Sequence, residues 1–540
     1  MSGLFDKRAD GASRREARSQ KEHLARRKSR IISISVVSVV ALVFICALFI
    51  NSNIIRRTMP AITIGGIAFS AAEFDYFYNA AYFEYHERIT EQFSQMPELA
   101  ASMLPAPRWE KPFPTQVYNH DTGETWADFF VEWAIRSMSE LVGLYNASIA
   151  SGFVLEGEQR LRYENEIEGL LREADMYSAM QPHNYPTPAS YLQALYGNSI
   201  NEATLRKVME FVFTAISYSE HVRDSISYSG EDLEAYYLEN RDDLDIFKYR
   251  TFFVPAESVF RGEHETEEDF IEAQETVLTE ARELAMLVAA SISTEEDFIE
   301  SAAIHGDDFS DDPDSSLREM QGEWLDSDLT SWLLDRSRSY GDVGTVDVAA
   351  GTHVLFFINR DDNDYQTTSM RQILIIRESV YPEDYPEGED DPDFIAAVEY
   401  YETEARERAE TVFELFLLGG ATEEHLIELM EEHSDDSTDG GFYDGMAKFH
   451  YFGHGESFLA MRVVSEIEDW LFEPWREFGD FELVNTEAFG YHLLYFMGHG
   501  ERFRDIISGD RMRTRDYALW MDELPESDVS KHWVFSLTQQ

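Results

Sequence analysis

The sequence predicts an α+β fold of several domains, and three observations support this prediction. The chain has 540 residues, which is too long for a single ordinary hydrophobic core. Apolar residues in the range 60–226 recur mainly at helical spacing. From residue 248 onward, strands rich in β-branched and aromatic residues alternate with helices, and this order occurs twice. We therefore expect a helical region followed by two copies of one α+β domain.

Composition and charge narrow the class of protein. Hydrophobic residues make up 44% of the chain and aromatic residues 14%, which is enough to fill folded cores and excludes a disordered chain. The net charge of −59 argues against nucleic acid as a partner and against docking on anionic lipid. A solvated acidic surface in a salty or extracellular medium accounts for this charge.

The N-terminus combines a basic tail with an uncharged apolar run. Residues 1–30 contain ten Lys or Arg and four Asp or Glu, so their net charge is +6 and the rest of the chain carries −65. The segment 31–50, "IISISVVSVVALVFICALFI", is long enough as a helix to span the roughly 30 Å hydrocarbon core of a bilayer. We predict a basic cytoplasmic tail at 1–30, a single transmembrane helix at 31–50 in the cell membrane, and an extracytoplasmic position for the remaining chain.

A cleaved signal peptide is the alternative for this segment. It is disfavoured because the basic region before the apolar run is long and no Ala-x-Ala cleavage pattern follows. Cys46, the only cysteine, lies inside the run, and the small residue that a lipoprotein signal needs before its Cys is missing. The part of the chain after this run is therefore expected to have no disulfide and no thiol chemistry.

The region 58–230 begins with a predicted strand and continues as helices. Ile62, Ile64 and Ile67 indicate a short strand with a Gly turn, and Ser70 is a typical N-cap for the helix that follows. Later helices include one that opens on Asn201. A connecting helix is expected at 231–248 after the capping residue Ser229.

The two predicted α+β copies occupy residues 249–362 and 368–500. Each has the order strand, long helix, second helix and final strand. The final strands read "THVLFFI" (352–358) and "YHLLYFM" (491–497), with a His in the same place. A C-terminal helical segment is expected at 501–540.

The sequence of the second copy resembles those of parvulin-type peptidyl-prolyl cis–trans isomerases, which have an FKBP-like superfold. The similar stretches are "MRQILII" (370–376), "SDDSTDGGFYDG" (434–445) and "FGYHLLYF" (489–496). The stretches "ITIGGIAFSAAEFD" (62–75) and "DLEAYYLENRDD" (232–243) are similar to the N-terminal chaperone module of SurA/PrsA-type foldases. The whole therefore resembles a membrane-anchored foldase of the SurA/PrsA/PpiD type with two parvulin-like domains, over about residues 58–520.

The resemblance implies isomerisation of Xaa-Pro bonds, which lowers an amide rotation barrier of ~18–20 kcal/mol and needs no nucleophile. The same reaction needs no cofactor and no metal, so neither is expected. His450 and His454, which are four residues apart, also lack a third ligand at matching spacing. Gln372 departs from the family pattern, in which the first strand carries a His. By resemblance, the catalytic positions are His492, Asp436, Gln372 and Ser437, and the substrate-binding positions are Val463, Ile467, Phe472 and Phe489.

The first copy departs further from the family pattern. Thr251 stands at the first His position, "DDPDSSLREMQGEW" (311–324) replaces the Gly-Gly stretch, and only His353 remains. We interpret this copy as a scaffold or a peptide-binding surface. For His492 two interpretations stay open, a catalytic group and a histidine that orders the end of a strand by hydrogen bonds.

Three functions follow from these features. The first is a membrane-tethered extracytoplasmic foldase whose partners are unfolded or nascent exported proteins with Xaa-Pro bonds, with the secretion machinery as a further contact. The second is a holdase whose parvulin-shaped modules bind without turnover, which the Gln at position 372 favours. The third, an acidic adhesin or structural ectodomain, is disfavoured by the duplicated strand–helix order.

Overall fold

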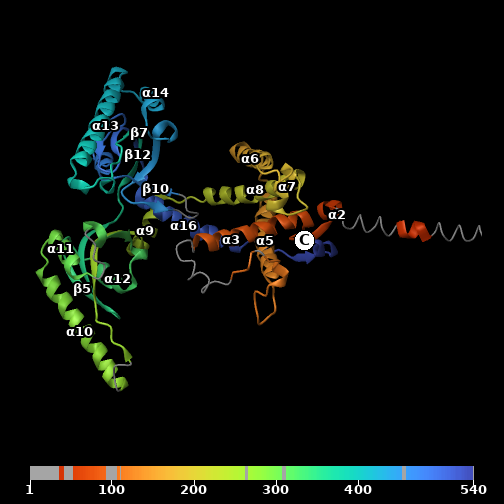
Figure 1. The fold of residues 1–540 in the computed structure, drawn as a ribbon, viewed down its shortest axis with the longest axis horizontal. Coiled ribbons are helices and arrows are strands. Elements are labelled where there is room, and N and C mark those ends of the chain that lie inside the picture. The colour runs from red at the N-terminus through yellow and green to blue at the C-terminus, as the bar shows by residue number, and fades with distance from the viewer. Residues whose placement is uncertain are drawn as a thin grey trace, which may run out of the picture. The chain divides into compact units, whose positions relative to one another are not determined.

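The computed structural model describes residues 36–41, 53–92, 106–109, 111–261, 266–306, 312–452 and 458–538 (Figure 1). These residues form two compact units. The first comprises the described parts of Met1–Ser225 together with Tyr517–Gln540, and the second is Ile226–Asp516. Helices and three sheets are present among the described residues, so the predicted α+β class is confirmed.

The predicted cytoplasmic tail and most of the predicted transmembrane helix lie outside the described residues. Of the segment 31–50, the structure describes only 36–41, which are helical. Among the helices that the structure does describe, none combines the length and the apolar character needed to cross a bilayer.

In the first unit, a β-hairpin follows α2 and leads directly into a helix. Strands β1 and β2 pair through a turn in which Gly65 and Gly66 have φ angles of +52° and +84°, a backbone region that favours glycine. Ser70 then closes a capping box with Glu73. The Ser70 N–H donates to Glu73 Oε2 at 2.6 Å, and the Glu73 N–H donates to Ser70 Oγ at 3.3 Å. The expected N-cap at Ser70 is therefore present.

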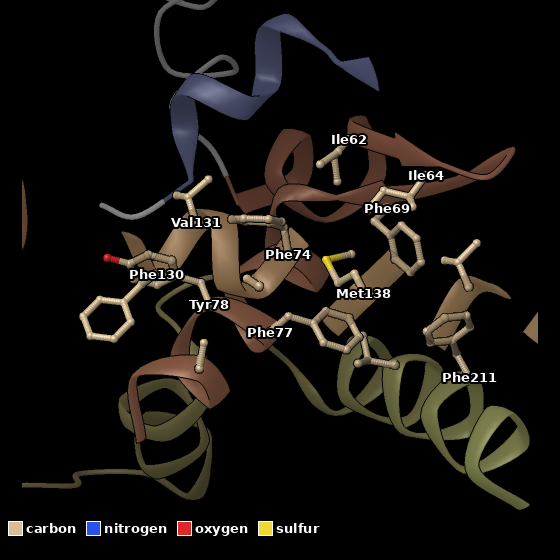
Figure 2. Close-up of a cluster of buried hydrophobic side chains, with 14 of the residues drawn as sticks. Ile62, Ile64, Phe69, Phe74, Phe77, Tyr78, Phe130, Val131, Met138 and Phe211 are labelled. Atoms are coloured by element: carbon tan, nitrogen blue, oxygen red, sulfur yellow. The ribbon is translucent and has the colours of Figure 1, made fainter. Parts of the chain in front are cut away.

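The core of the first unit lies between this hairpin and helices α3 and α5 (Figure 2). Phe74 of α3 and Phe130 of α5 are completely buried, and Ile62 and Ile64 cover them from the hairpin. A second cluster is formed by α6, α7 and α8 around Ile167. The aromatic residues of this region are therefore mainly core residues.

The C-terminal segment is not only helical, as 501–540 was expected to be. After α16, residues Val529–Lys531 form strand β13, which pairs antiparallel with β1 and places Lys531 opposite Ile62. A 3₁₀ helix then packs Val534 against Ile55. All three residues of β13 are exposed on both faces, so the strand lacks the alternation that identifies strands in a sequence. The elements of the first unit are α2 (Asn53–Thr58), β1 (Pro60–Ile64), β2 (Ile67–Ser70), α3 (Ala71–Gln92), η1 (Phe113–Thr115), α5 (Trp126–Ser151), α6 (Gly157–Met180), α7 (Pro188–Tyr196), α8 (Glu202–Ser225), the end of α16 (Phe503–Asp522), β13 (Val529–Lys531) and η8 (Trp533–Leu537).

The second unit contains two sheets with the same strand order and the same register. The orders are β4-β3-β6-β5 and β8-β7-β12-β11, the second being extended by β10 and β9 beyond β8. His353 lies opposite Phe253, two residues after Thr251, and His492 lies opposite Leu374, two residues after Gln372. The recurring stretches around His353 and His492 are therefore equivalent strands in two similar sheets.

Two side-chain contacts also recur in both copies. Arg250 donates to Glu295 at 2.7 Å, and Arg371 donates to Glu423 at 2.8 Å, each pair joining the first strand to the start of the second helix. Likewise, Arg338 and Arg476 each stack on a Trp ring at 4.1 Å and donate to the carbonyl of that Trp at 3.1 Å. Equivalent ion pairs and stacks support two copies of one architecture.

Each sheet is covered on both faces. In the second copy, α13 and α14 pack on one face around Ile373 and Leu493 (Figure 1), and α15 packs on the other around Leu494 and Phe496. The elements of the second unit are α9 (Gly230–Leu244), β3 (Ile246–Pro255), α10 (Glu267–Ser291), α11 (Glu295–His305), η3 (Pro313–Ser316), β4 (Leu317–Gln321), η4 (Gly322–Trp324), α12 (Ser327–Leu333), β5 (Val343–Val348), β6 (Gly351–Asp361), β7 (Gln366–Ile376), η5 (Pro382–Asp384), η6 (Gly388–Asp390), α13 (Pro392–Leu418), α14 (Glu423–His433), η7 (Asp439–Gly441), β8 (Phe442–Ala447), β9 (Tyr451–Phe452), β10 (Phe458–Arg462), α15 (Ser465–Leu471), β11 (Phe481–Thr486), β12 (Gly490–Arg502) and the start of α16.

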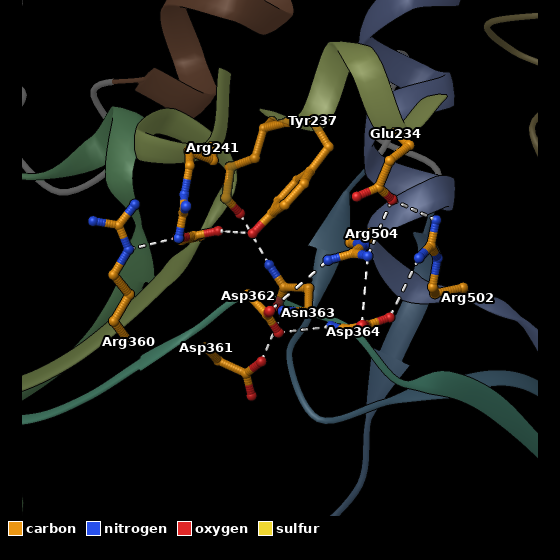
Figure 3. Close-up of polar contacts among 12 residues, drawn as sticks. Glu234, Tyr237, Arg241, Arg360, Asp361, Asp362, Asn363, Asp364, Arg502 and Arg504 are labelled. Atoms are coloured by element: carbon orange, nitrogen blue, oxygen red, sulfur yellow. Dashed lines mark hydrogen bonds and ion pairs between the residues drawn. The ribbon is translucent and has the colours of Figure 1, made fainter. Parts of the chain in front are cut away.

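A buried polar network holds the junction between the copies (Figure 3). The Tyr237 hydroxyl and the Arg360 guanidinium both donate to the fully buried Asp245, each at 2.5 Å. Arg502 and Arg504 both donate to Glu234 of α9 at 3.0 Å. The charge of the buried Asp245 is costly to separate from its partners, so this part of the network holds α9 against the strand that carries Arg360.

Candidate functional site

The strand register of the second copy brings His492 and Gln372 together. His492 of β12 lies opposite Leu374 of β7, and Gln372 lies opposite Leu494, so the two side chains are diagonal neighbours on the same face of the sheet. The His492 Nδ1 and Gln372 Oε1 atoms are 2.9 Å apart. Both residues are buried, with exposed fractions of 3% and 7%.

The segment after α14 brings Asp436 to the same place. Ser434 Oγ accepts from the Leu374 N–H at 3.1 Å, and the Asp435 N–H donates to the Leu374 carbonyl at 2.8 Å. These bonds attach the segment to the edge of β7. Gln372 Nε2 then donates to Asp436 Oδ2 at 2.8 Å, and the Thr438 N–H donates to Asp436 Oδ1 at 2.9 Å. Asp436, Gln372 and His492 therefore form a continuous hydrogen-bonded relay.

The relay determines which nitrogen of His492 carries the proton. A carboxylate only accepts hydrogen bonds, so the Gln372 amide must turn its NH₂ group to Asp436 and its oxygen to His492. The His492 Nδ1 atom must then be the donor to that oxygen. Nε2 is left as an acceptor, and the Thr486 hydroxyl lies 3.1 Å from it. His492 is thus assigned as the Nδ1–H tautomer.

The electrostatics of the site favour a neutral imidazole beside an ionised acid. Burial lowers the pKa of His492 to about 4, although the charges of Asp436 and Glu466 act in the opposite direction. Burial acts to raise the pKa of Asp436, but hydrogen bonds from Thr438, Tyr443 and Gln372 outweigh it and lower that pKa. At neutral pH the relay is therefore a carboxylate, an amide and an uncharged imidazole.

Two members of the site were not predicted from the sequence. The Tyr443 hydroxyl donates to Asp436 Oδ2 at 2.7 Å, and the fully buried Thr486 contacts His492. Tyr443 lies on β8 next to the Gly-Gly stretch, and Thr486 ends the strand paired with β12. Their strand positions relative to His492 would have identified them, but that signal requires knowledge of the register.

The four predicted substrate-binding residues do not all lie beside His492. Phe489 is 48% exposed and meets the His492 ring edge to face at 6.3 Å. Ile467 is buried in the core under α15, and Val463 packs against that core. Phe472 packs against the same core and also contacts Tyr365 at 5.5 Å between ring centroids. The structure thus brings Phe489, and not Ile467 or Phe472, to the surface beside His492.

Ser437, the fourth predicted catalytic residue, is exposed. It makes none of the hydrogen bonds that join Asp436, Gln372 and His492. The hydroxyl that the resemblance assigned to this position is supplied in the structure by Thr486 and Tyr443.

The first copy has a related pair of side chains, Thr251 and His353, at the strand positions of Gln372 and His492. Thr251 Oγ1 lies 3.3 Å from His353 Nδ1, and burial lowers the pKa of His353. The residue at the position of Asp436 lies outside the described residues. Ala302 and Gly306 stand where the second copy has Met430 and Ser434, as their matching places at the helix end indicate. A cavity of about 260 Å³ lies beside these small residues and His353.

No metal site is present in the part of the chain that the structure describes, where no three His, Cys, Asp or Glu side chains are grouped to hold an ion. The relay itself offers one carboxylate and one imidazole joined through an amide. Those groups satisfy one another and leave no vacant set of ligands for a metal.

Comparison with known proteins does not assign the chain to a family, so the interpretation of its function rests on the geometry of the site. No protein-family model matches the chain, and no curated protein matches its sequence. The relay in the second copy, and the contact between Thr251 and His353 at the same strand positions in the first, therefore carry the functional argument.

Proposed function

We propose that the chain is a membrane-tethered extracytoplasmic foldase, a parvulin-type peptidyl-prolyl cis–trans isomerase and chaperone that assists exported proteins. The observation that carries this proposal is the relay of Asp436, Gln372 and His492 in the second copy, with Phe489 exposed beside it. Gln372 occupies the family's first His position and takes part in the relay through both ends of its amide. The departure from the family pattern is therefore compatible with an ordered site.

The chemistry required is electrostatic and steric, without proton transfer to a leaving group. Rotation about an Xaa-Pro bond passes through a twisted amide that has lost its conjugation. A site accelerates rotation if it binds the twisted amide more tightly than the planar one. Phe489 offers an apolar face to a proline ring, and the neutral, buried His492 ring that it packs against is held in place by Gln372 and Thr486. Fixed dipoles of this kind need no reorganisation during the reaction.

The proposed partners are unfolded or nascent exported proteins that contain Xaa-Pro bonds, with the secretion machinery as a further contact. The proposed tether is the apolar segment 31–50 behind the basic tail. In the first unit, aromatic side chains beyond the core, such as the 41%-exposed Phe83, are the proposed contacts for unfolded chains.

Refolding of a proline-limited client tests the foldase proposal. The full chain in detergent micelles should accelerate the slow phase of a client whose refolding is limited by a cis-proline, which otherwise takes tens of seconds or more. A variant of the client without that proline is the matched control, and its refolding should not be accelerated. Equal refolding rates of the proline-limited client with and without the chain would contradict the proposal.

A holdase without turnover is the second candidate function. It is favoured by the burial of His492 and by the protein side chains, Gln372 and Thr486, that lie within hydrogen-bonding distance of its two ring nitrogens. A holdase should suppress aggregation of both clients and slow the refolding of both, because it binds unfolded chains irrespective of proline. The same pair of clients therefore separates the two functions.

A further inference from the structure

Tyr443 lies at the centre of the polar contacts around Asp436. It belongs to β8, where it pairs with Met370 of β7, and its ring packs against the core under α15. Its hydroxyl donates to Asp436 Oδ2 at 2.7 Å and lies 2.9 Å from Thr438 Oγ1. The same carboxylate oxygen accepts from Gln372.

The first copy has a different residue at this position. Arg318 lies opposite Tyr249 of β3, in the register that places Tyr443 opposite Met370. The guanidinium of Arg318 donates to the carbonyls of Ser315 and Leu317, at 2.8 and 2.7 Å. A tyrosine at this position is therefore found in the copy that has the complete relay, and not in the copy that lacks Gln372.

We propose that Tyr443 is a positioning residue of the second copy: its hydroxyl holds the Asp436 carboxylate as the acceptor that orients Gln372 and, through Gln372, His492. This inference rests on the proposed function for its relevance to isomerisation, but the positioning role itself concerns only the protein's own groups. It adds a residue to the site that the resemblance does not include.

The orientation of the Gln372 amide couples Asp436 to His492. While Asp436 is ionised, it can only accept, so Gln372 presents NH₂ to Asp436 and oxygen to His492. If Asp436 takes up a proton, it becomes a donor and favours the reversed amide, which would present NH₂ to His492 Nδ1. Hydrogen bonds that stabilise the charged form of Asp436 therefore preserve the orientation of the relay.

The titratable groups that face Asp436 come from two elements. Tyr443 reaches it from β8, and His492 acts on it from β12. Glu466 of α15 faces His492, and its carboxylate accepts from the Glu487 N–H at 2.9 Å. Loss of the Tyr443 hydroxyl removes one donor from Asp436 and leaves these other groups in place.

The test compares two tyrosine variants of the full chain, Tyr443→Phe and Tyr491→Phe. Tyr491 is a matched control because its hydroxyl donates to the carboxylate of Glu402 at 2.8 Å in the same domain, among the residues around α13. The carboxyl carbon of Asp436 is followed by NMR against pH in aspartate-labelled protein and assigned by its disappearance in Asp436→Asn. Isomerisation of an Xaa-Pro peptide is followed over the same pH range by exchange NMR, which needs no coupling protease.

In Tyr443→Phe, the Asp436 titration midpoint should rise by about one pH unit, the size expected for loss of one hydrogen bond to a charged group. The pH at which isomerisation falls off in acid should rise by the same amount. Tyr491→Phe should change neither this pH nor the Asp436 midpoint. An unchanged Asp436 midpoint in a folded Tyr443→Phe variant would overturn the inference. If the midpoint rises but wild-type protein catalyses no isomerisation, the positioning role stands and the proposed function fails.

Discussion

The Nδ1 atom of His492 lies 2.9 Å from the Oε1 atom of Gln372, on the adjacent strand of the same sheet. Because Gln372 also donates to Asp436, this single contact connects the last strand of the second copy to the loop after α14. A glutamine at this position can therefore orient the imidazole from one side and bind an acid on the other. In the first copy, the contact at the same strand positions is between Thr251 and His353.

Gln372 variants should change isomerisation in opposite directions. Gln372→Glu should lower kcat/KM on the order of tenfold, less than the roughly 10²–10³-fold loss where one oriented donor dominates, because glutamate cannot donate to Asp436. Gln372→His should raise it, because an imidazole can donate to Asp436 and accept from His492. Gln366→Glu, at the exposed end of the same strand, is the control for added charge. A Gln372→Glu variant as active as wild type would show that the relay plays no part.

Burial of His492 predicts a loss of stability in mild acid. Its folded pKa of about 4 lies below the unfolded value of 6.5, so the unfolded state binds more protons between these values. The free energy of unfolding should therefore fall by about 3 kcal/mol in total as pH falls from 6.5 to 4. His492→Gln should remove this part of the pH dependence, whereas His499→Gln, on the exposed side of the same strand, should not. Identical slopes in all three proteins would contradict this account.

The ion pair between Arg371 and Glu423 should stabilise the second copy. The Arg371 side chain is 17% exposed, donates to Glu423 at 2.8 Å and also donates to the Gly440 carbonyl. Arg371→Met should destabilise the sheet by about 3 kcal/mol, because it leaves a largely buried carboxylate unpaired. Arg408→Met removes a more exposed pair with Asp435 and should cost at most about 1 kcal/mol. Hydrogen exchange of the β7 amides measures the loss of stability in each variant. Equal losses in the two variants would show that burial of the ion pair is unimportant.

The membrane topology can be tested with a reporter fused after Arg57. The basic tail and the apolar segment predict that a reporter active only outside the cytoplasm will be active there. The mature protein should also retain its N-terminal residues, because an anchor is not removed. A cytoplasmic signal would contradict the orientation, and a shortened N-terminus would show a cleaved signal peptide instead.

The sequence predicted those parts of the fold that leave a local signal. The final strands around His353 and His492 were found because an apolar run follows a Gly turn twice, and Ser70 and Ser229 were found because capping side chains have a strong local preference. Strand β13 was not found, because its three exposed residues pair with β1 from more than 460 positions away. Pairing over such distances depends on the tertiary fold rather than on local pattern.

The candidate site was predicted in part for the same reason. His492, Gln372 and Asp436 were assigned by resemblance, and the structure joins them by hydrogen bonds. Tyr443 and Thr486 were missed because their roles depend on which residues lie opposite them in the sheet. Phe472 was assigned to the substrate-binding wall, and in the structure it packs against the core that contains Ile467 while its ring contacts Tyr365 of the linker between the copies.

If the second copy is an isomerase, the full chain must catalyse isomerisation of an Xaa-Pro peptide, and two histidine variants show which copy is responsible. Wild-type protein should accelerate isomerisation, His492→Ala should lose about tenfold or more, and His353→Ala should stay within about twofold of wild type. Circular dichroism establishes that both variants are folded. No acceleration by wild-type protein, or equal losses in the two folded variants, would contradict the account.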